Sequence, residues 1–106
     1  MSQNKIQFFK NAIQENPTEP FPYFALAKTY EKLENLSEAR TQYEHLIRNF
    51  PDYGGTYYHL VLLLIELEDW EEAKAICDRG LDVLQNTGER QLYNELLMLR
   101  DQHFQE

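Results

Sequence analysis

The feature that most constrains this 106-residue chain is a period of 34 residues in its middle part. When the sequence is shifted against itself by 34 positions, aromatic, aliphatic and small residues fall on residues of the same kind. The matching pairs include Tyr23 with Tyr57, Leu26 with Leu60, Ala39 with Ala73 and Ile47 with Leu81. A period of this length is typical of repeat proteins, in which each repeat is one supersecondary unit that buries its apolar face against its neighbours.

Each period predicts a pair of helices. In the first period, Tyr23, Leu26 and Tyr30 follow one another at intervals of three and four residues, which is the spacing of one helix face. A second apolar face starts at Ala39, and Pro51, which has no backbone N–H to donate, ends it. The second period has the same pattern, so the middle of the chain is expected to form two helix–turn–helix units.

The turn inside each unit carries a helix-start signal. Asn35 and Glu38 form a capping-box pattern, in which the Asn35 side chain accepts a hydrogen bond from the new helix and Glu38 reaches back to the N–H of Asn35. Asp69 and Glu72 repeat this pattern 34 residues later. Trp70, which lies next to the second turn, is expected to pack underneath it.

The segments outside the two periods are expected to be helices that cover the ends of the array. Phe9, Ala12 and Ile13 match the second helix of a preceding unit, and a further amphipathic helix follows Gly88. Terminal helices of this kind cover apolar faces that the end units would otherwise expose. A single domain of residues 1–106 is predicted, with an N-terminal capping helix at 2–16, repeats at 20–53 and 54–87, and a C-terminal capping helix at 89–105.

The pattern resembles the tetratricopeptide repeat, a helix–turn–helix unit of 34 residues. The first period carries the family's pattern at Tyr23, Leu26, Ala27, Tyr30, Ala39, Tyr43, Leu46 and Pro51. The second period departs from the pattern twice, because Val61 replaces a small residue and Gln85 replaces the proline. The resemblance implies an all-α fold, namely a short right-handed α-solenoid of helix–turn–helix repeats with terminal capping helices.

The charge balance argues against binding to nucleic acids and to membrane surfaces. The formal net charge is −8, and the lysines and arginines form no basic run. Nucleic acids and anionic membranes both select for concentrated basic side chains. The longest strongly apolar stretch, residues 60–65, is far too short to span a bilayer. A single cysteine forms no internal disulfide, so we expect an intracellular, cytoplasmic protein.

No residue pattern in the sequence indicates catalysis, a metal or a cofactor. His45, His59 and His103 lie at no metal-ligand spacing from another histidine or cysteine. Cys77 occupies a helix position that an aromatic residue usually fills, so we interpret it as a packing residue. The acidic stretch at residues 66–72 spans an inter-helix turn, where the helix dipole favours negative charge. We therefore expect that the protein is not an enzyme.

The candidate site follows from the family resemblance. In this family the first helix of each repeat lines a concave surface along which partners bind. Transferred position by position, the partner-binding residues are expected to be Phe21, Phe24, Lys28, Glu31, Tyr58, His59, Leu62 and Ile65. The same transfer also gives the flanking residues Lys32, Gly55 and Glu66, and candidates to extend the face from the final helix are Leu92, Leu96 and Leu99.

One subclass of this family grips a C-terminal carboxylate with lysine, asparagine and arginine at set inward positions. The corresponding residues here are Phe24, Lys28, His59, Glu89 and Tyr93. Lys28 alone is cationic, so most of the charge-assisted hydrogen bonds that hold a carboxylate are missing. This departure argues against a carboxylate clamp and leaves an aromatic and aliphatic groove.

Several functions fit such a groove. The first is a non-catalytic adaptor or scaffold module that binds a peptide or helix of a partner protein. The second is structural homodimerisation through the same apolar face, and internal covering of that face by a terminal helix is a further alternative. A third is an accessory module for an enzyme in another chain or in another part of a longer chain. The sequence does not identify the partner protein.

Overall fold

The structure is a computed structural model that describes residues 2–104. This range contains six helices and no strand. They are α1 (Ser2–Glu15), α2 (Phe21–Lys32), α3 (Leu36–Asn49), α4 (Gly55–Glu66), α5 (Trp70–Thr87) and α6 (Arg90–His103). The prediction of an all-α chain of helix–turn–helix repeats is confirmed. Residues 1, 105 and 106 of the predicted domain, including the last residue of the predicted C-terminal helix, lie outside the described range.

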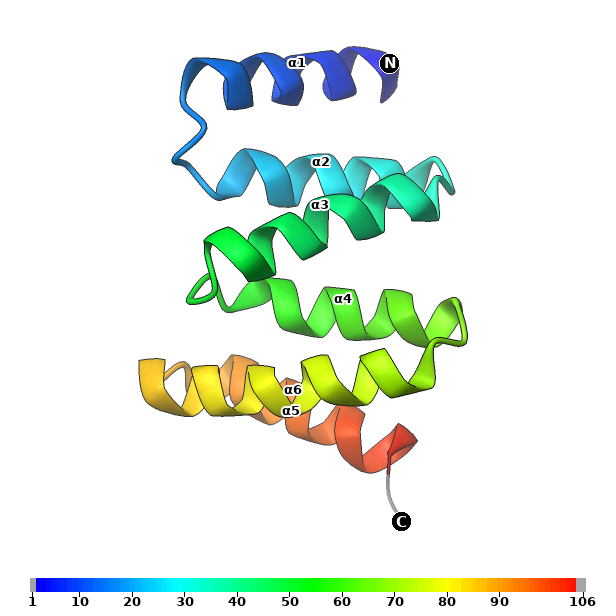
Figure 1. The fold of residues 1–106 in the computed structure, drawn as a ribbon, viewed down its shortest axis with the longest axis vertical. Helices are drawn as coiled ribbons and strands as arrows, with labels where there is room; N and C mark the ends of the chain where they lie inside the picture. The colour runs from blue at the N-terminus through cyan, green and yellow to red at the C-terminus, as the bar shows by residue number, and fades with distance from the viewer. Residues whose placement is uncertain (1, 105–106) are drawn as a thin grey trace. The chain divides into compact units, whose positions relative to one another are not determined.

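The helices form two compact units, Met1–Phe50 and Pro51–Glu106. The first unit holds α1, α2 and α3, and the second holds α4, α5 and α6, coloured from blue to red along the chain in Figure 1. Each unit contains one predicted helical hairpin, α2 with α3 or α4 with α5, and one further helix. In the first unit α1 packs against α2, and in the second unit α6 packs against α5 and α4.

The first unit is built around the contact between α2 and α3. Ala27 on α2 and Ala39 on α3 have no exposed surface, as expected for small residues where two helices approach closely. Tyr43 and Leu46 are equally buried. The hydroxyl of Tyr23 donates to the carbonyl of Pro17 at 3.0 Å, which ties the start of α2 to the loop that precedes it.

The second unit repeats this design around α4 and α5. The hydroxyl of Tyr57 donates to the carbonyl of Pro51 at 2.6 Å. This bond is equivalent to that of Tyr23 with Pro17, one repeat earlier. Gly80 on α5 leaves no room for a side chain, because a Cβ atom placed there would lie 2.7 Å from both Tyr57 and Leu96. This glycine therefore lets α5 pack closely against α4 and α6.

Both inter-helix turns begin the next helix in the same way. The side chain of Asn35 accepts from the N–H of Glu38, and that of Asp69 accepts from the N–H of Glu72, each at 3.4 Å. This confirms the N-cap half of the predicted capping box. The predicted return bond from Glu38 is wrong, because the N–H of Asn35 donates to the carbonyl of Tyr30 at 2.9 Å.

A residue in the left-handed conformation explains that difference. Glu34 and Glu68, which precede the two N-caps, have φ angles of 60° and 61°. The N–H of Glu34 donates to the carbonyl of Glu31 while the N–H of Asn35 donates to that of Tyr30. This pair of bonds is a Schellman motif, so the end of α2 uses the N–H that the capping box needs.

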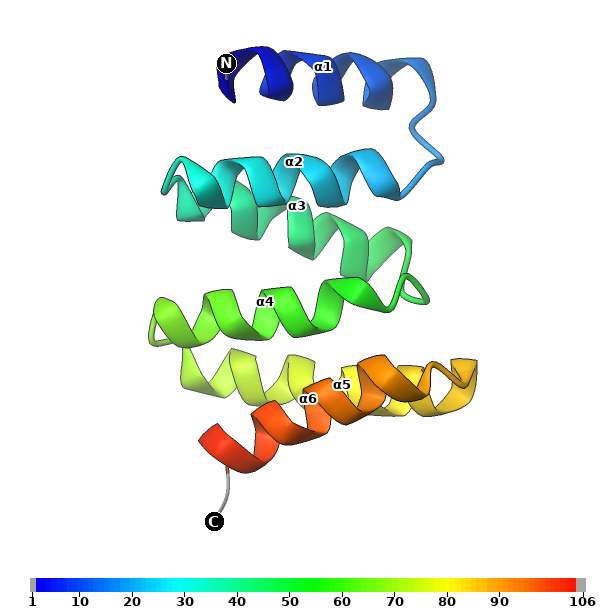
Figure 2. The ribbon, with the colours of Figure 1, turned by 180° about the vertical axis from the view of Figure 1, so that it is seen from behind.

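The helix α6 completes the second unit by packing onto it. Figure 2 shows α6, in orange and red, lying across α5. Leu96 is fully buried and Leu99 nearly so, and the thiol of Cys77 lies 3.9 Å from the carbonyl oxygen of Leu96. The expectation that these two leucines extend the partner-binding face is therefore wrong, because they pack inside the unit. Leu92 is half-buried near Gly54.

Trp70 also differs from the expectation. Its side chain is 48% exposed instead of packing beneath the turn. The indole ring lies 6.4 Å, between ring centres, from both His103 and Phe104 at the end of α6. Sequence spacing alone did not indicate that α6 reaches this side of the turn.

Candidate functional site

The first four predicted binding residues lie on one side of α2. Phe21, Phe24, Lys28 and Glu31 are spaced by three, four and three residues, so they share one helix face. The side chain of Phe21 is 57% exposed. Phe24 is half-buried, and its ring meets Tyr43 in a T-shaped arrangement with 6.0 Å between ring centres. The face is therefore aromatic toward the start of α2 and charged toward its end.

Glu31 has a structural partner that the sequence did not reveal. Its carboxylate accepts a hydrogen bond from the Tyr43 hydroxyl at 2.7 Å, which links α2 to α3. The ammonium of Lys28 lies 3.8 Å from the same carboxylate. Burial, and then the bond to Glu31, raise the pKa of Tyr43, so its hydroxyl stays protonated as the donor. Glu31 thus ties α2 to α3 within the first unit.

The other four predicted residues lie on α4. Leu62 is 37% exposed, and Tyr58, His59 and Ile65 are half-buried. The rings of Tyr58 and His59 are edge-to-face, with 5.6 Å between their centres. Apart from the imidazole of His59 and the hydroxyl of Tyr58, these four side chains are apolar. The α4 face therefore offers apolar surface, whereas the α2 face combines aromatic rings with an ion pair.

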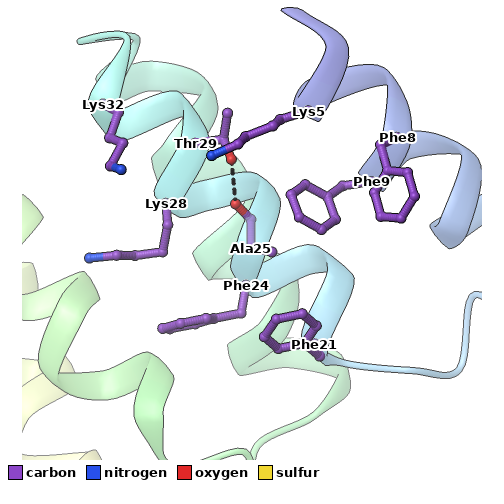
Figure 3. A pocket seen from close by; sticks show the side chains of 9 residues that line it. All are labelled: Lys5, Phe8, Phe9, Phe21, Phe24, Ala25, Lys28, Thr29 and Lys32. Carbon is purple, nitrogen blue, oxygen red and sulfur yellow. Dashed lines mark hydrogen bonds between the residues drawn. The ribbon is translucent and has the colours of Figure 1, made fainter. Parts of the chain in front are cut away.

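A cleft of about 520 Å³ lies between α1 and α2, and Figure 3 shows its lining. Four phenylalanines and three lysines are among the residues around it. The lining consists of Lys5, Phe8, Phe9, Phe21, Phe24, Ala25, Lys28, Thr29 and Lys32. The family resemblance had indicated the contributions from Phe21, Phe24, Lys28 and Lys32, but no residue of α1.

Side chains from both helices project toward this cleft in Figure 3. Phe9 extends from α1 toward α2, and Lys5 directs its ammonium toward Thr29. The hydroxyl of Thr29 donates to the carbonyl of Ala25 at 2.8 Å, so its proton is already used within α2. The ring of Phe8 meets that of Phe9 edge-on at 5.3 Å and is 66% exposed. The cleft is therefore an open, mostly aromatic surface with ammonium groups at its border.

A signal for the α1 side of the cleft is present in the 34-residue period. Ala39 and Ala73, both fully buried, lie at the close contact between paired helices. One period before Ala39 stands Lys5, a long cationic residue at a position where both full repeats have a small one. That replacement indicates that α1 is not covered in the way that α3 and α5 are.

The described part of the chain offers no obvious metal chemistry. Within it, no group of three or more His, Cys, Asp or Glu side chains could hold a metal ion. Cys77 is buried, and this burial is the main cause that raises the pKa of its thiol to about 11, so the thiol is neutral at ordinary pH. The ring of His45 stacks on that of Tyr23 with 4.4 Å between their centres, and burial lowers the pKa of the His45 imidazole. None of the described helices has the length and apolar character needed to cross a membrane.

Comparison with known proteins agrees with the repeat geometry. A family model described as Suppressor of forked protein (Suf) matches residues 4–95. The crystal structure of a tetratricopeptide repeat domain protein from Salinibacter ruber is 33% identical, with a TM-score of 0.77 over 80% of this chain and 94% of that chain. The chain is a tetratricopeptide repeat protein of the Suf family. A solution NMR structure of a tetratricopeptide repeat domain protein from the same organism gives a TM-score of 0.78 at 33% identity, over 83% of this chain and 89% of that one.

A curated relative of this tetratricopeptide repeat protein is much longer. Cellulose synthase operon protein C of Pseudomonas fluorescens (strain SBW25) is 28% identical over 71 residues. That match covers 67% of this chain and 6% of the relative, so the chain spans a small part of the relative's length. The Suf match begins at residue 4, within α1, and so includes α1 together with both helical hairpins. Folds of this type generally mediate protein–protein interaction, which makes the exposed faces of α2 and α4 candidate contact surfaces.

Proposed function

We propose that this tetratricopeptide repeat protein is a non-catalytic adaptor or scaffold module that binds a peptide or helix of a partner protein on the exposed face of the first helix of a repeat, α2 in the first unit or α4 in the second. The observation that carries this proposal is the exposure of large apolar side chains on both faces, 57% for Phe21 and 37% for Leu62. Apolar side chains that the packing of a repeat leaves in water are typical of contact surfaces. The function common to the repeat family supports the same proposal.

The chemistry of the two faces favours a partner segment with an apolar side. Tyr58 and Leu62 on α4 offer ring and aliphatic surface, and Phe24 on α2 adds a half-buried ring. Lys28, whose ammonium lies 3.8 Å from the Glu31 carboxylate, supplies a polar border to the α2 face. A segment that buries its apolar residues against either face gains affinity from the removal of apolar surface from water. A cytoplasmic location is part of this proposal, supported by the single, buried cysteine.

Peptides selected from a random displayed library against the immobilised wild-type chain would test the proposal. We expect the selected peptides to lose binding to Phe24→Asp or Leu62→Asp, because a buried carboxylate in an apolar contact carries a large desolvation penalty. Met98→Asp is the matched control, since Met98 is 62% exposed on α6 and outside both faces. Circular dichroism checks that all three variants remain helical. Selected peptides that bind all three variants with the wild-type affinity would contradict the proposal.

Homodimerisation is a second candidate function, favoured by the apolar character of the α4 face. A face with few charges, such as that of Tyr58, Leu62 and Ile65, offers little electrostatic repulsion to a second copy, although the chain as a whole carries a net charge of −8. Sedimentation velocity over a range of concentrations distinguishes the two functions. A dimer that Leu62→Asp dissociates and Met98→Asp does not would favour this candidate, and a monomer at every concentration would exclude it.

A further inference from the structure

The helix α1 is a third copy of the helix that occurs as α3 and α5. The three helices start at Ser2, Leu36 and Trp70, which are spaced by the 34-residue period. α1 and α3 also end in phase, at Glu15 and Asn49. α1 therefore has the length and register of the second helix of a repeat.

The two later copies each have a helix packed over the face that contains the small residue. In the first unit α2 packs against α3, and Ala39 and Tyr43 are fully buried. In the second unit α4 packs against α5, and Ala73 and Cys77 are fully buried in the same way. In both repeats, these positions of the second helix are therefore buried where the first helix of the same repeat packs against it.

On α1 the corresponding positions remain open. Lys5 stands at the position of Ala39 and is exposed, and Phe9 stands at the position of Tyr43 and is half-buried. Phe8, beside them, is 66% exposed. Within residues 2–104, α2 is the helix that packs extensively on α1, and the two helices leave between them the cleft of about 520 Å³ that Lys5 and Phe9 line.

The charges around this cleft oppose the charge of the chain. Lys5, Lys28 and Lys32 surround it, and Lys28 is within 3.8 Å of Glu31, whereas the chain as a whole has a net charge of −8. A helix that covered α1 as α2 covers α3 would also cover Lys5, and an ammonium removed from water needs a carboxylate or another acceptor beside it. With three lysines around the cleft, an occupant that supplies acidic side chains as well as an apolar face fits it best.

We propose that the cleft between α1 and α2 binds an acidic amphipathic helix of a partner protein. The apolar side of that helix packs on Phe9, Phe21 and Phe24, and its carboxylates face Lys5 and Lys32. The helix occupies, relative to α1, the place that α2 occupies relative to α3. The inference rests on the proposed function, because it names the partner chemistry for one end of the α2 face.

Two synthetic peptides of the length of α2 test this charge preference. Both have the same leucine and alanine face, and one has glutamates beside that face where the other has lysines. Fluorescence anisotropy with the full chain measures their affinities. We expect the glutamate peptide to bind at least about tenfold more tightly than the lysine peptide, as is typical when close charge pairs at an interface are reversed.

Matched charge reversals in the protein then locate the binding site. The double variant Lys5→Glu/Lys32→Glu is expected to lower the affinity for the glutamate peptide by about tenfold or more and to raise the affinity for the lysine peptide. Lys10→Glu/Lys74→Glu changes the net charge equally at exposed positions outside the cleft lining and is expected to leave both affinities within about twofold. Equal effects of the two double variants, or no binding of the glutamate peptide to the wild-type chain, would overturn the proposal.

The remaining outcomes separate this inference from the proposed function and from self-association. If library-selected peptides need Leu62 while the glutamate peptide does not bind, the cleft proposal fails and the proposed function stands. If the library yields no binding peptide and the glutamate peptide does not bind either, both proposals fail. If the wild-type chain dimerises and Lys5→Glu/Lys32→Glu dissociates the dimer while Lys10→Glu/Lys74→Glu does not, a second copy is the occupant, and the partner-helix proposal is overturned.

Discussion

The helices that complete the two units, α1 and α6, differ in how far they bury their side chains. α6 buries Leu96 and Leu99, which are 0% and 4% exposed. None of the described side chains of α1 reaches that degree of burial, and its Phe8 is 66% exposed. Both helices are amphipathic. The apolar side of α6 is buried in the second unit, whereas that of α1 leaves an apolar cleft in the first unit.

The neighbours of the two helices explain this difference. α6 contacts both α4 and α5, and Gly80 gives Leu96 the room to enter between them. Two periods before Gly80 the chain has Ala12, and α1 packs extensively on α2 alone among the helices of residues 2–104. A terminal helix with two neighbours can bury whole side chains, whereas a helix with one neighbour keeps much of its apolar face in water.

Truncation of Leu96 is expected to produce the largest effect. Leu96→Ala removes a fully buried side chain and leaves a cavity, so we expect the free energy of unfolding to fall by about 2–5 kcal/mol. Phe9→Ala, on the half-buried side of α1, is expected to lower it by about 1 kcal/mol, because only part of the ring is removed from water on folding. Urea denaturation followed by circular dichroism measures both values. An equal loss for the two variants would remove the distinction between α6 and α1.

Enlarging the small residue of each second helix tests whether α1 is uncovered. Ala39→Leu and Ala73→Leu overpack a closed helix contact and are expected to lower the free energy of unfolding by roughly 1–3 kcal/mol. Lys5→Leu places the same side chain at the equivalent position of α1, where the surface is open, and is expected to change it by less than about 0.5 kcal/mol. Thermal unfolding of the three variants gives the comparison. A destabilisation by Lys5→Leu that matches Ala39→Leu would show that α1 is covered in solution.

The hydroxyl of Tyr43 allows a smaller test within the first unit. Tyr43→Phe removes the bond to the Glu31 carboxylate, and we expect a loss of about 1.5 kcal/mol, because hydrogen bonds to charged groups exceed those to neutral ones. Tyr57→Phe removes a bond to the Pro51 carbonyl and is the neutral counterpart in the second unit, with an expected loss of about 1 kcal/mol. Chemical denaturation of both variants measures the difference. A smaller loss for Tyr43→Phe than for Tyr57→Phe would contradict the role given to Glu31.

Much of the fold was predictable, because residue types that recur every 34 positions indicate which positions are buried. The coincidence of Ala39 with Ala73 and of Tyr23 with Tyr57 fixed which helix faces are buried, and these residues are buried in the structure. The N-cap residues were equally visible, since Asn and Asp at a helix start have a local physical cause. The way in which the preceding helix ends was not visible in the sequence, because nothing in its composition shows that a glutamate such as Glu34 adopts the left-handed conformation.

The candidate site was less predictable, because it depends on which neighbours a helix has. Family positions indicated the α2 and α4 faces, but they did not indicate that Glu31 is held by Tyr43 or that Leu96 is buried. The cleft required the placement of α1 beside α2, which comes from contacts distant in sequence. Lys5 was the one residue whose identity departed from the period in a way that pointed to an open face.

The two left-handed glutamates give a small expected gain in stability and the closest comparison between the units. A residue with a Cβ atom at this conformation is disfavoured by about 1–2 kcal/mol, and glycine avoids that penalty while losing roughly 0.5–1 kcal/mol of backbone entropy. Glu34→Gly and Glu68→Gly, at φ angles of 60° and 61°, are therefore each expected to raise the free energy of unfolding by about 0.5–1 kcal/mol. Glu34→Ala and Glu68→Ala are the controls, because they remove the charge but keep the Cβ atom. Equal gains from alanine and glycine would assign the effect to charge, whereas a gain confined to glycine and equal at both sites supports the same turn in both repeats, whatever helix completes each unit.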